Sequence, residues 1–308
     1  MFRFKLRNRS VVFLALLVLL ASAPALAADF TVGAGSACAF ADAIRAANSD
    51  SAVGGCPAGQ GHDAISLASD INLNDKPPTI DSHLSIDGKG HRISAGTRHR
   101  ILKVKDGGVL ELRNVALHQG YTSRAPGAAL YVEDGKANLV NVKIVDNLNE
   151  SSYGGAVGIA SGSLTCLGCA FQSNLGVTGG ALWVGGNAFA TIDNSRFEDN
   201  NARQGGAIFV DGGGLEFNSS KAYRNDAGFG GGIFSKDGTI RLQSHSEFSG
   251  NYASAHGGGL YADGGLVIIA DTSMRDNQAV RGRHIYAAAD LYIFRPTDIS
   301  RDGIYHVR

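Results

Sequence analysis

Several residue types and motifs that mark common protein classes are scarce in this chain of 308 residues. It has six prolines, two methionines and one tryptophan, and its 28 basic residues balance its 28 acidic ones. The balance gives no basic excess of the kind that general nucleic-acid binding requires. The sequence also lacks Gly-x-Ser-x-Gly, His-Glu-x-x-His and P-loop patterns. These absences argue against the enzyme classes that such motifs identify.

Glycine is the residue in excess, with 42 copies, about twice its usual share of roughly 7%. A hydrophobic content of 44% can fill a core, and so few prolines argue against disorder. We therefore expect an all-β protein made of many short strands joined by tight turns.

The first 27 residues have the pattern of a secretory signal peptide. Four basic residues precede an apolar run at 11–20, and Ala25-Leu26-Ala27 fits a small-x-small cleavage site. The apolar run is short for a membrane span. We expect a mature chain that begins near Ala28 or Asp29, has a net charge of −4 and contains no membrane span. Its predicted location is the periplasm, the cell surface or the extracellular space.

Four cysteines form two local pairs, Cys38 with Cys56 and Cys166 with Cys169. In an exported chain an even number of cysteines predicts disulfides. The second pair is a Cys-x-x-Cys, but its surroundings are strand-like and repetitive rather than a strand–helix redox unit. We predict disulfides for both pairs, with buried free thiols as the alternative for Cys166 and Cys169.

Two motifs recur with the same period of 25–27 residues. The first is a Gly-Gly-small-aliphatic tetrad; its copies begin at Gly154, Gly179, Gly205, Gly230 and Gly257, with weaker ones at Gly127 and Gly282. The second is a bulky residue three positions before an asparagine; its copies are Ile144/Asn147, Phe171/Asn174, Phe197/Asn200, Phe248/Asn251 and Met274/Asn277. One copy is slipped, at Tyr223 and Asn225.

Each period contains three strand-like stretches separated by turn residues, which predicts a right-handed parallel β-helix of nine or ten coils. The bulky and aliphatic residues should stack inward, and the asparagines should form a ladder at a turn. We assign residues 28–62 to an N-terminal cap with a helix at 40–48 and the Cys38–Cys56 link. Residues 63–294 form the β-helix, and 295–308 form a covering tail.

These motifs resemble the repeat of the chlamydial polymorphic outer membrane proteins, a pectin-lyase-like β-helix family of surface adhesins. Residues 38–48, CAFADAIRAAN, are similar to the C-S-L-R-E/D-A-I-x-x-A-N opening of many bacterial secreted β-helix proteins. The resemblance implies the same fold and an adhesin-like function. Only a short segment follows the last predicted coil, so we expect no counterpart of that family's membrane barrel.

The segments between the asparagines and the glycines vary, and they supply the candidate binding residues. Aromatic, arginine and histidine side chains suit stacking on sugars and hydrogen bonding to them; those predicted to line one edge of the rod are Tyr153, Arg203, Phe229, Tyr252, His256 and Arg281. The alternative is ordinary surface variation.

A predicted column of carboxylates consists of Asp211, Asp237 and Asp263, which are equally spaced along the chain and each followed by glycine. Turn formation explains such residues. Carboxylates one coil apart, about 4.8 Å, also suggest a Ca²⁺ site or the roughly 5 Å pair of a retaining glycosidase.

A basic region on the first coils combines histidines, arginines and lysines; its members are His83, His91, His99, His118, Arg92, Arg98, Arg100, Lys103 and Lys105. It suggests a polyanion site. The histidine spacings match no known metal signature, so we assign no metal ligands.

The sequence favours an exported, non-enzymatic protein that binds a polysaccharide or a cell-surface protein as adhesins do. One alternative is a polysaccharide lyase or glycoside hydrolase that acts on an acidic polymer. Another is a structural protein of the cell envelope. We assign no catalytic residue.

Overall fold

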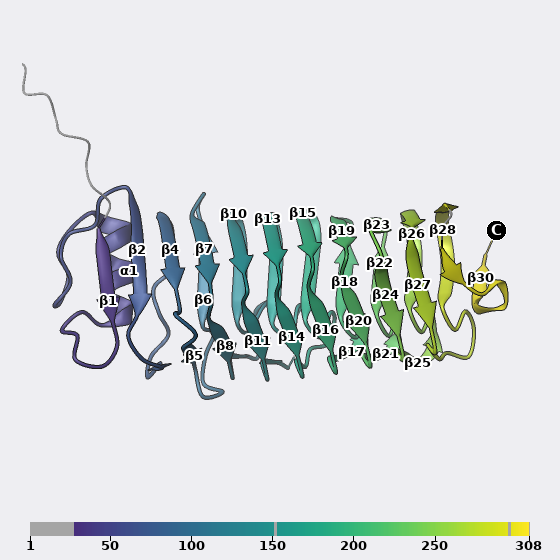
Figure 1. Cartoon of the computed structure of the whole chain (residues 1–308), viewed down its shortest axis with the longest axis horizontal. Helices are drawn as coiled ribbons and strands as arrows, with labels where there is room; N and C mark the ends of the chain where they lie inside the picture. Colours follow the sequence, from purple (N-terminus) through teal and green to yellow (C-terminus); the bar gives the residue numbers. More distant parts are fainter. Residues whose placement is uncertain (1–27, 151–152, 295–296, 308) are drawn as a thin grey trace, which may run out of the picture.

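The computed structural model describes residues 28–150, 153–294 and 297–307. The chain winds into a parallel β-helix of about nine turns, which forms a straight rod (Figure 1). This confirms the predicted fold. The predicted signal peptide lies outside the described residues, and none of the helices within them is long and apolar enough to cross a membrane.

Face 1 of the rod holds the strands that follow the glycine tetrads, together with their equivalents in the coils at either end. Its short members are β6 (Leu102–Lys105), β18 (Ile208–Asp211), β22 (Ile233–Lys236) and β30 (Ile304–His306). Five longer strands begin on face 1 and continue onto face 2; they are β10 (Leu130–Val140), β13 (Val157–Leu167), β15 (Leu182–Asp193), β26 (Leu260–Ala270) and β28 (Ile285–Phe294). Irregularities in strand register mark the bend in several of them.

Face 2 is completed by shorter strands, namely β1 (Asp29–Val32), β2 (His62–Leu67), β4 (His83–Asp87), β7 (Val109–Arg113), β19 (Gly214–Asn218) and β23 (Thr239–Gln243). Because every pairing between these coils is parallel, equivalent residues of successive coils lie side by side.

Face 3 is a separate ten-stranded parallel sheet. Its strands are β3 (Ile71–Asn72), β5 (Arg92–Ser94), β8 (Ala116–His118), β11 (Lys143–Val145), β14 (Ala170–Gln172), β16 (Arg196–Glu198), β20 (Lys221–Tyr223), β24 (Ser246–Ser249), β27 (Thr272–Arg275) and β29 (Asp298–Ile299).

A short edge joins face 3 back to face 1. It contains one pair of strands, β9 (Tyr121–Thr122) with β12 (Leu148–Asn149), and one set of three, β17 (Asn201–Gln204), β21 (Asp226–Phe229) and β25 (Tyr252–His256). The sequence predicted three strands in each coil, so this edge adds a fourth stretch to several of them.

The glycine tetrads turn the chain from the short edge into face 1. Gly205 has a φ of +65°, which L side chains rarely adopt. A Cβ on the next residue, Gly206, would lie 2.3 Å from the carbonyl oxygen of Gly231 in the following coil. The aliphatic residue that ends each tetrad then points inward and stacks on its equivalents, as Ile208 does between Leu182 and Ile233.

The predicted asparagine ladder is present and buried. Side-chain amides of neighbouring coils are joined by hydrogen bonds of 2.9 Å from Nδ2 to Oδ1; the ladder runs through Asn147, Asn174, Asn200, Asn225, Asn251 and Asn277. From Asn174 onward each Oδ1 also accepts the backbone N–H of the preceding asparagine, at 3.0 Å from Asn174 to Asn200, and Asn147 Oδ1 accepts that of Gly120. The ladder therefore satisfies backbone groups at the turn between face 3 and the short edge.

The stacking of the bulky residues differs from the prediction at the slipped copy. The residue in register with Phe197 is Ala222, not Tyr223. Phe217 of face 2 fills the space that the small side chain leaves, with its ring centroid 5.9 Å from Phe197 and 5.2 Å from Phe248. The inward position is therefore Ala222, three residues before Asn225 as in the other copies. Phe217 from β19 supplies the volume that alanine lacks.

A second, hydroxyl ladder follows the corner between faces 2 and 3. Ser195 Oγ accepts the backbone N–H of Cys169 at 2.9 Å, and Ser220 Oγ accepts that of Ser195 at 3.0 Å. Cys169 and Thr272 occupy equivalent positions in other coils. Serine, threonine and cysteine share these positions, so no single residue type marks the ladder in the sequence.

Cys166 and Cys169 are buried free thiols, so the predicted disulfide between them is wrong. Cys166 lies in the inward row of β13, in register with Leu139 and Ile192. Cys169 lies at the ladder corner, where its thiol approaches the carbonyl oxygen of Leu139 at 3.6 Å. Both sulfurs fill space in the core.

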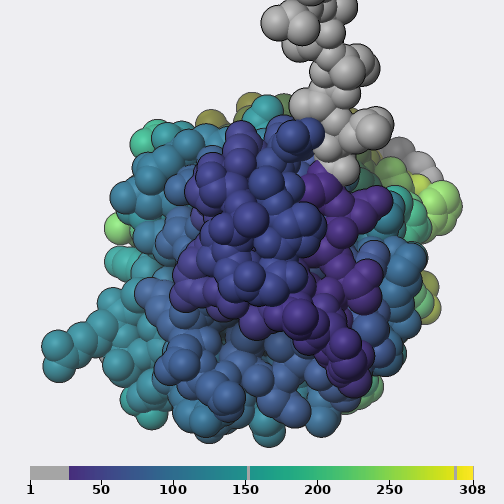
Figure 2. Space-filling model, turned by 90° about the vertical axis from the view of Figure 1, so that its left-hand side faces the viewer, coloured from purple at the N-terminus to yellow at the C-terminus, as the bar shows by residue number. Residues whose placement is uncertain are grey.

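The N-terminal cap covers the open end of the first coil (Figure 2). Its helix α1 (Phe40–Ser49), predicted at 40–48, buries an apolar face that includes Phe40, Ile44 and Ala47. The predicted disulfide between Cys38 and Cys56 is present.

The C-terminal segment continues the stacking of the coils. After the short helix η1 (Arg301–Gly303), β30 pairs with β28, and β29 pairs with β27. The segment predicted as a covering tail thus adds one further short strand to each of two faces.

We predict that Asn200→Ala lowers the free energy of unfolding by roughly 2–5 kcal/mol. It removes the acceptor of the Asn174 backbone N–H and the donor to the Phe171 carbonyl oxygen, and each such buried group costs about 1–3 kcal/mol when unpaired. Chemical unfolding of the variant measures the loss. The exposed neighbour Asn201 is the control, because Asn201→Ala should change stability by less than about 0.5 kcal/mol. Equal effects of the two substitutions would contradict the ladder's role.

Phe197→Ala should be destabilising by roughly 3–5 kcal/mol. The ring is fully buried and stacks on Phe171 with centroids 4.3 Å apart, and neighbouring coils on both sides prevent the cavity from collapsing. A melting temperature equal to that of the parent protein would show that this side chain does not fill the core.

Candidate functional site

An outward column of aromatic residues runs along face 1. Each member directly follows an inward aliphatic residue, and successive side chains of a strand point to opposite faces. The register aligns what we call the aromatic column: Tyr131, Trp183, Phe209, Phe234, Tyr261, Tyr286 and Tyr305. From Phe209 onward, successive ring centroids lie 4.8–5.1 Å apart.

The aromatic column is interrupted once, at Gly158, which stands between Tyr131 and Trp183. A Cβ there would lie 2.8 Å from the Cβ of Pro126. Tyr153 extends toward this region from the preceding turn, and its ring stacks on Trp183 with centroids 4.7 Å apart. Tyr153 is 42% exposed, so one face of the stack is open to solvent.

A second column lies beside the first, formed by the residues that immediately precede the glycines. Strand register and isolated bridges align what we call the corner column: Tyr153, Thr178, Gln204, Phe229, His256 and Arg281. Four of the six predicted binding residues belong to it. The structure therefore brings Tyr153, Phe229, His256 and Arg281 into one row.

The two columns contact each other through their rings. His256 stacks on Tyr286 with centroids 4.8 Å apart, and Phe229 meets Tyr261 edge to face at 5.5 Å. The guanidinium carbon of Arg281 lies 5.6 Å from the centroid of the Tyr305 ring. Together the columns form a continuous aromatic and polar strip along the rod.

The other two predicted binding residues lie beside the strip. Arg203 is exposed and, with Val177, Thr178, Gln204 and Phe229, lines a surface depression of about 260 Å³. Tyr252 begins β25 and is aligned with Asp226 and Gln278 at the other end of the short edge. Tyr252 therefore does not contribute to the corner column.

Burial changes along the strip. Trp183, Phe209 and Phe234 are only 8%, 3% and 4% exposed, and they form a small apolar cluster outside the main core. Toward the C-terminal end, Tyr305 is 41% exposed. Exposed ring surface is thus present at Tyr153 and at Tyr305, whereas the three rings in the middle of the strip are buried.

Three polar side-chain atoms lie buried beneath the strip. Thr178 Oγ1, Trp183 Nε1 and His256 Nδ1 are buried and have no hydrogen-bond partner within the described ranges. Burial raises the pKa of the Tyr261 phenol, and the negative charge of Asp263 adds to the rise. Tyr261 therefore keeps its proton and can act as a donor.

The predicted column of three aspartates is not formed. Lys236, not Asp237, stands in register between Asp211 and Asp263. The reason is the length of this coil. Strand pairing advances 25 residues here, from Ile208 to Ile233, whereas Asp211 and Asp237 are 26 residues apart. Asp237 adopts a left-handed turn conformation with φ of 53°, and its N–H donates to the Asp263 carbonyl oxygen at 2.9 Å.

This register changes the chemistry available to the aspartates. Asp211 and Asp263 lie two coils apart, about 9.6 Å, which is nearly twice the separation of a retaining carboxylate pair. The lysine between them supplies positive charge, with its Nζ 3.9 Å from Asp211 Oδ1. Calcium binding stays a prediction, but the alignment of three carboxylates from which it was predicted is not formed.

The basic region of the first coils is divided among local partners. His91 and Arg92 both pair with Asp70, His118 pairs with Asp146, and Lys103 pairs with Glu133. Buried Arg100 donates to the carbonyl oxygens of Pro126 and Gly127. The predicted polyanion site is therefore not assembled as one patch. His83 instead meets His62 and Glu111, an arrangement that no sequence spacing indicated.

Comparison with known proteins identifies the repeat region. Residues 127–293 match a family model described as a right handed beta helix region, and no curated protein and no solved structure matches the chain. The matched segment contains the glycine corners, the asparagine ladder, the corner column and the aromatic column as far as Tyr286, and such a fold fits a protein related to surfaces or polysaccharides. The match covers more than half of the chain, which therefore belongs to the right-handed β-helix family.

Proposed function

We propose that this protein is exported and binds a polysaccharide along the strip formed by the aromatic column and the corner column. The observation that carries the proposal is the alignment of aromatic rings and polar groups over successive coils on one side of the rod. A repeating surface of this kind suits a repeating polymer, because weak contacts on successive coils reinforce one another.

The chemistry of the strip supports a carbohydrate rather than an apolar ligand. Tyrosine and tryptophan combine a flat apolar ring with a polar group. Gln204 in the corner column and Arg203 beside it add an amide and a guanidinium group at the surface depression. Sugars present both apolar C–H faces and hydroxyl groups, so they match both kinds of contact.

Arginines favour a polymer that carries some carboxylates. Arg203 stands at the depression beside Gln204, and Arg281 lies against Tyr305 near the C-terminal end of the strip. Both are exposed. A guanidinium can bind a carboxylate through two parallel hydrogen bonds, so uronate-containing chains are the preferred candidates.

We further propose that binding is not coupled to cleavage. Asp211 and Asp263 are aligned with each other on face 1, and Lys236 lies between them. We propose instead an adhesin-like role, in which the strip holds the protein to a glycan-bearing surface.

The test is retention of the protein by immobilised acidic and neutral polysaccharides. Tyr153→Ala and Arg281→Ala should each weaken binding by about tenfold, which corresponds to about 1.4 kcal/mol. Tyr292→Ala is the matched control, because Tyr292 is 53% exposed but lies on β28 away from both columns. It should bind like the parent.

Two results would contradict the proposal. If Tyr292→Ala weakens binding as much as Tyr153→Ala, the strip is not the site. If incubation with any of the polymers releases unsaturated uronates or new reducing ends, the protein is an enzyme rather than a binder.

A further inference from the structure

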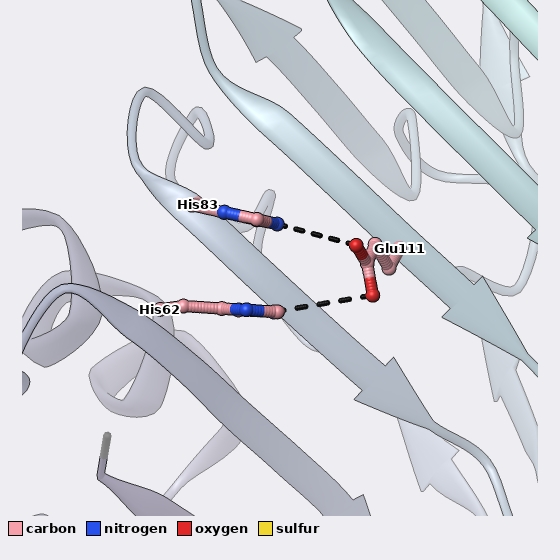
Figure 3. A group of neighbouring side chains, drawn as sticks. All are labelled: His62, His83 and Glu111. Atoms are coloured by element: carbon pink, nitrogen blue, oxygen red, sulfur yellow. Dashed lines mark hydrogen bonds and ion pairs between the residues drawn. The ribbon is translucent and has the colours of Figure 1, made fainter. Parts of the chain in front are cut away.

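Three side chains from successive early coils meet on the outer surface of face 2. All three residues precede those of the strip in the sequence. His62 begins β2, His83 begins β4 in register with it, and Glu111 lies in β7 (Figure 3). Their potential ligand atoms all lie within 4.8 Å of one another. Both imidazoles direct Nε2 toward the carboxylate of Glu111 (Figure 3).

The contacts hold the three groups in one arrangement. The two imidazole rings are stacked, with centroids 3.6 Å apart and planes inclined by 9°. His83 Nε2 lies 3.3 Å from Glu111 Oε1, and His62 Nε2 lies 3.9 Å from Oε2. Ser85 Oγ lies 2.7 Å from His62 Nε2 and donates to Glu111 Oε2 at 3.0 Å.

The electrostatics favour a cation between the rings and the carboxylate. The two carboxylate oxygens of Glu111 each face an imidazole Nε2, Oε1 that of His83 and Oε2 that of His62. Closely stacked imidazoles repel each other when both are protonated, whereas one divalent ion can bind both neutral rings and the anion together.

We propose that His62, His83 and Glu111 form a binding site for a divalent transition-metal ion, with Zn²⁺ as its representative. Two imidazole nitrogens and one carboxylate oxygen are a ligand set that zinc accepts, whereas Ca²⁺ and Mg²⁺ prefer oxygen alone. Metal–ligand bonds of about 2.0–2.2 Å require small side-chain rotations. The three side chains are 40–45% exposed, so they have room to rotate in this way.

The position of the site gives it a structural role. An ion there would join three consecutive coils next to the N-terminal cap. These coils precede the asparagine ladder, whose first rung joins Asn147 to Asn174 and whose first backbone contact is at Gly120. The metal would thus hold the coils in register where the described residues form no asparagine ladder.

Calorimetric titration of Zn²⁺ into the full chain, purified without a histidine tag, tests the proposal. The parent should show one saturable site, and Zn²⁺ should raise its melting temperature. His83→Ala and Glu111→Gln should each weaken binding by about 100-fold. Glu111→Gln keeps the size of the side chain, so it reports on ligand chemistry even if His83→Ala lowers stability.

The matched control is His245→Ala. His245 Nδ1 lies 3.0 Å from Asp271 Oδ2, an exposed histidine–carboxylate pair without a second imidazole. This variant should bind Zn²⁺ like the parent. Hydrogen exchange should slow on zinc binding around residues 62–111 and not around 245–271.

Several outcomes would overturn the proposal. They are the absence of saturable Zn²⁺ binding, equal binding by the parent and both site variants, or an equally tight response to Ca²⁺. None of them bears on the strip, so the polysaccharide proposal is tested separately.

Discussion

The register between one coil and the next is the constraint on which the rest of the structure depends. Backbone hydrogen bonds fix it on the faces, and the asparagine ladder fixes it where the chain leaves face 3. Asn200 Oδ1 accepts two N–H groups of Asn174, while its Nδ2 donates to Phe171 and Asn225. A buried amide is tolerated because all of these groups are paired. A shift of one residue would break this pairing in the affected coil and turn its inward side chains to solvent.

The same register that aligns the core also builds the outer surface. Alternation along a strand places Phe234 outside whenever Ile233 is inside, so a column of rings on face 1 follows from the column of aliphatic residues. The glycine corner places Phe229 beside that column because no side chain intervenes at Gly230 and Gly231. A repeat that packs the core thus presents its variable positions in straight rows.

Much of this could be predicted from the sequence because the repeat is visible in it. The glycines and asparagines fixed the period, the inward columns and the ladder, and the helix and disulfide of the cap were recognisable from residues 38–56. Four of the proposed binding residues were identified from the variability of their segments. The aromatic column was not predicted, although Phe209, Phe234 and Tyr261 each follow a recognised tetrad, because the outward positions vary between coils and share no single residue type.

Several of the remaining errors have one physical origin, which is that the coils differ in length. Equal spacing along the chain leads from Asp211 to Asp237, whereas strand pairing leads to Lys236. Tyr223 was placed in the core for a similar reason, and the compensation by Phe217 depends on packing between two faces. His62 and His83 are separated by a first coil that is shorter than the later repeats, so their spacing belongs to no motif.

The asparagine ladder makes the rod extensible only in whole units. Each rung bonds to the rung before it and the rung after it, and no interior rung contacts the N-terminal cap. Duplication of one complete repeat in the gene would therefore lengthen the protein by a single strand spacing, about 4.8 Å, and leave both ends as they are. Insertion or deletion of a single residue within a turn would instead require that turn to change its conformation, so that the register of the neighbouring strands is kept. Relatives of this protein should accordingly differ in length by multiples of one repeat.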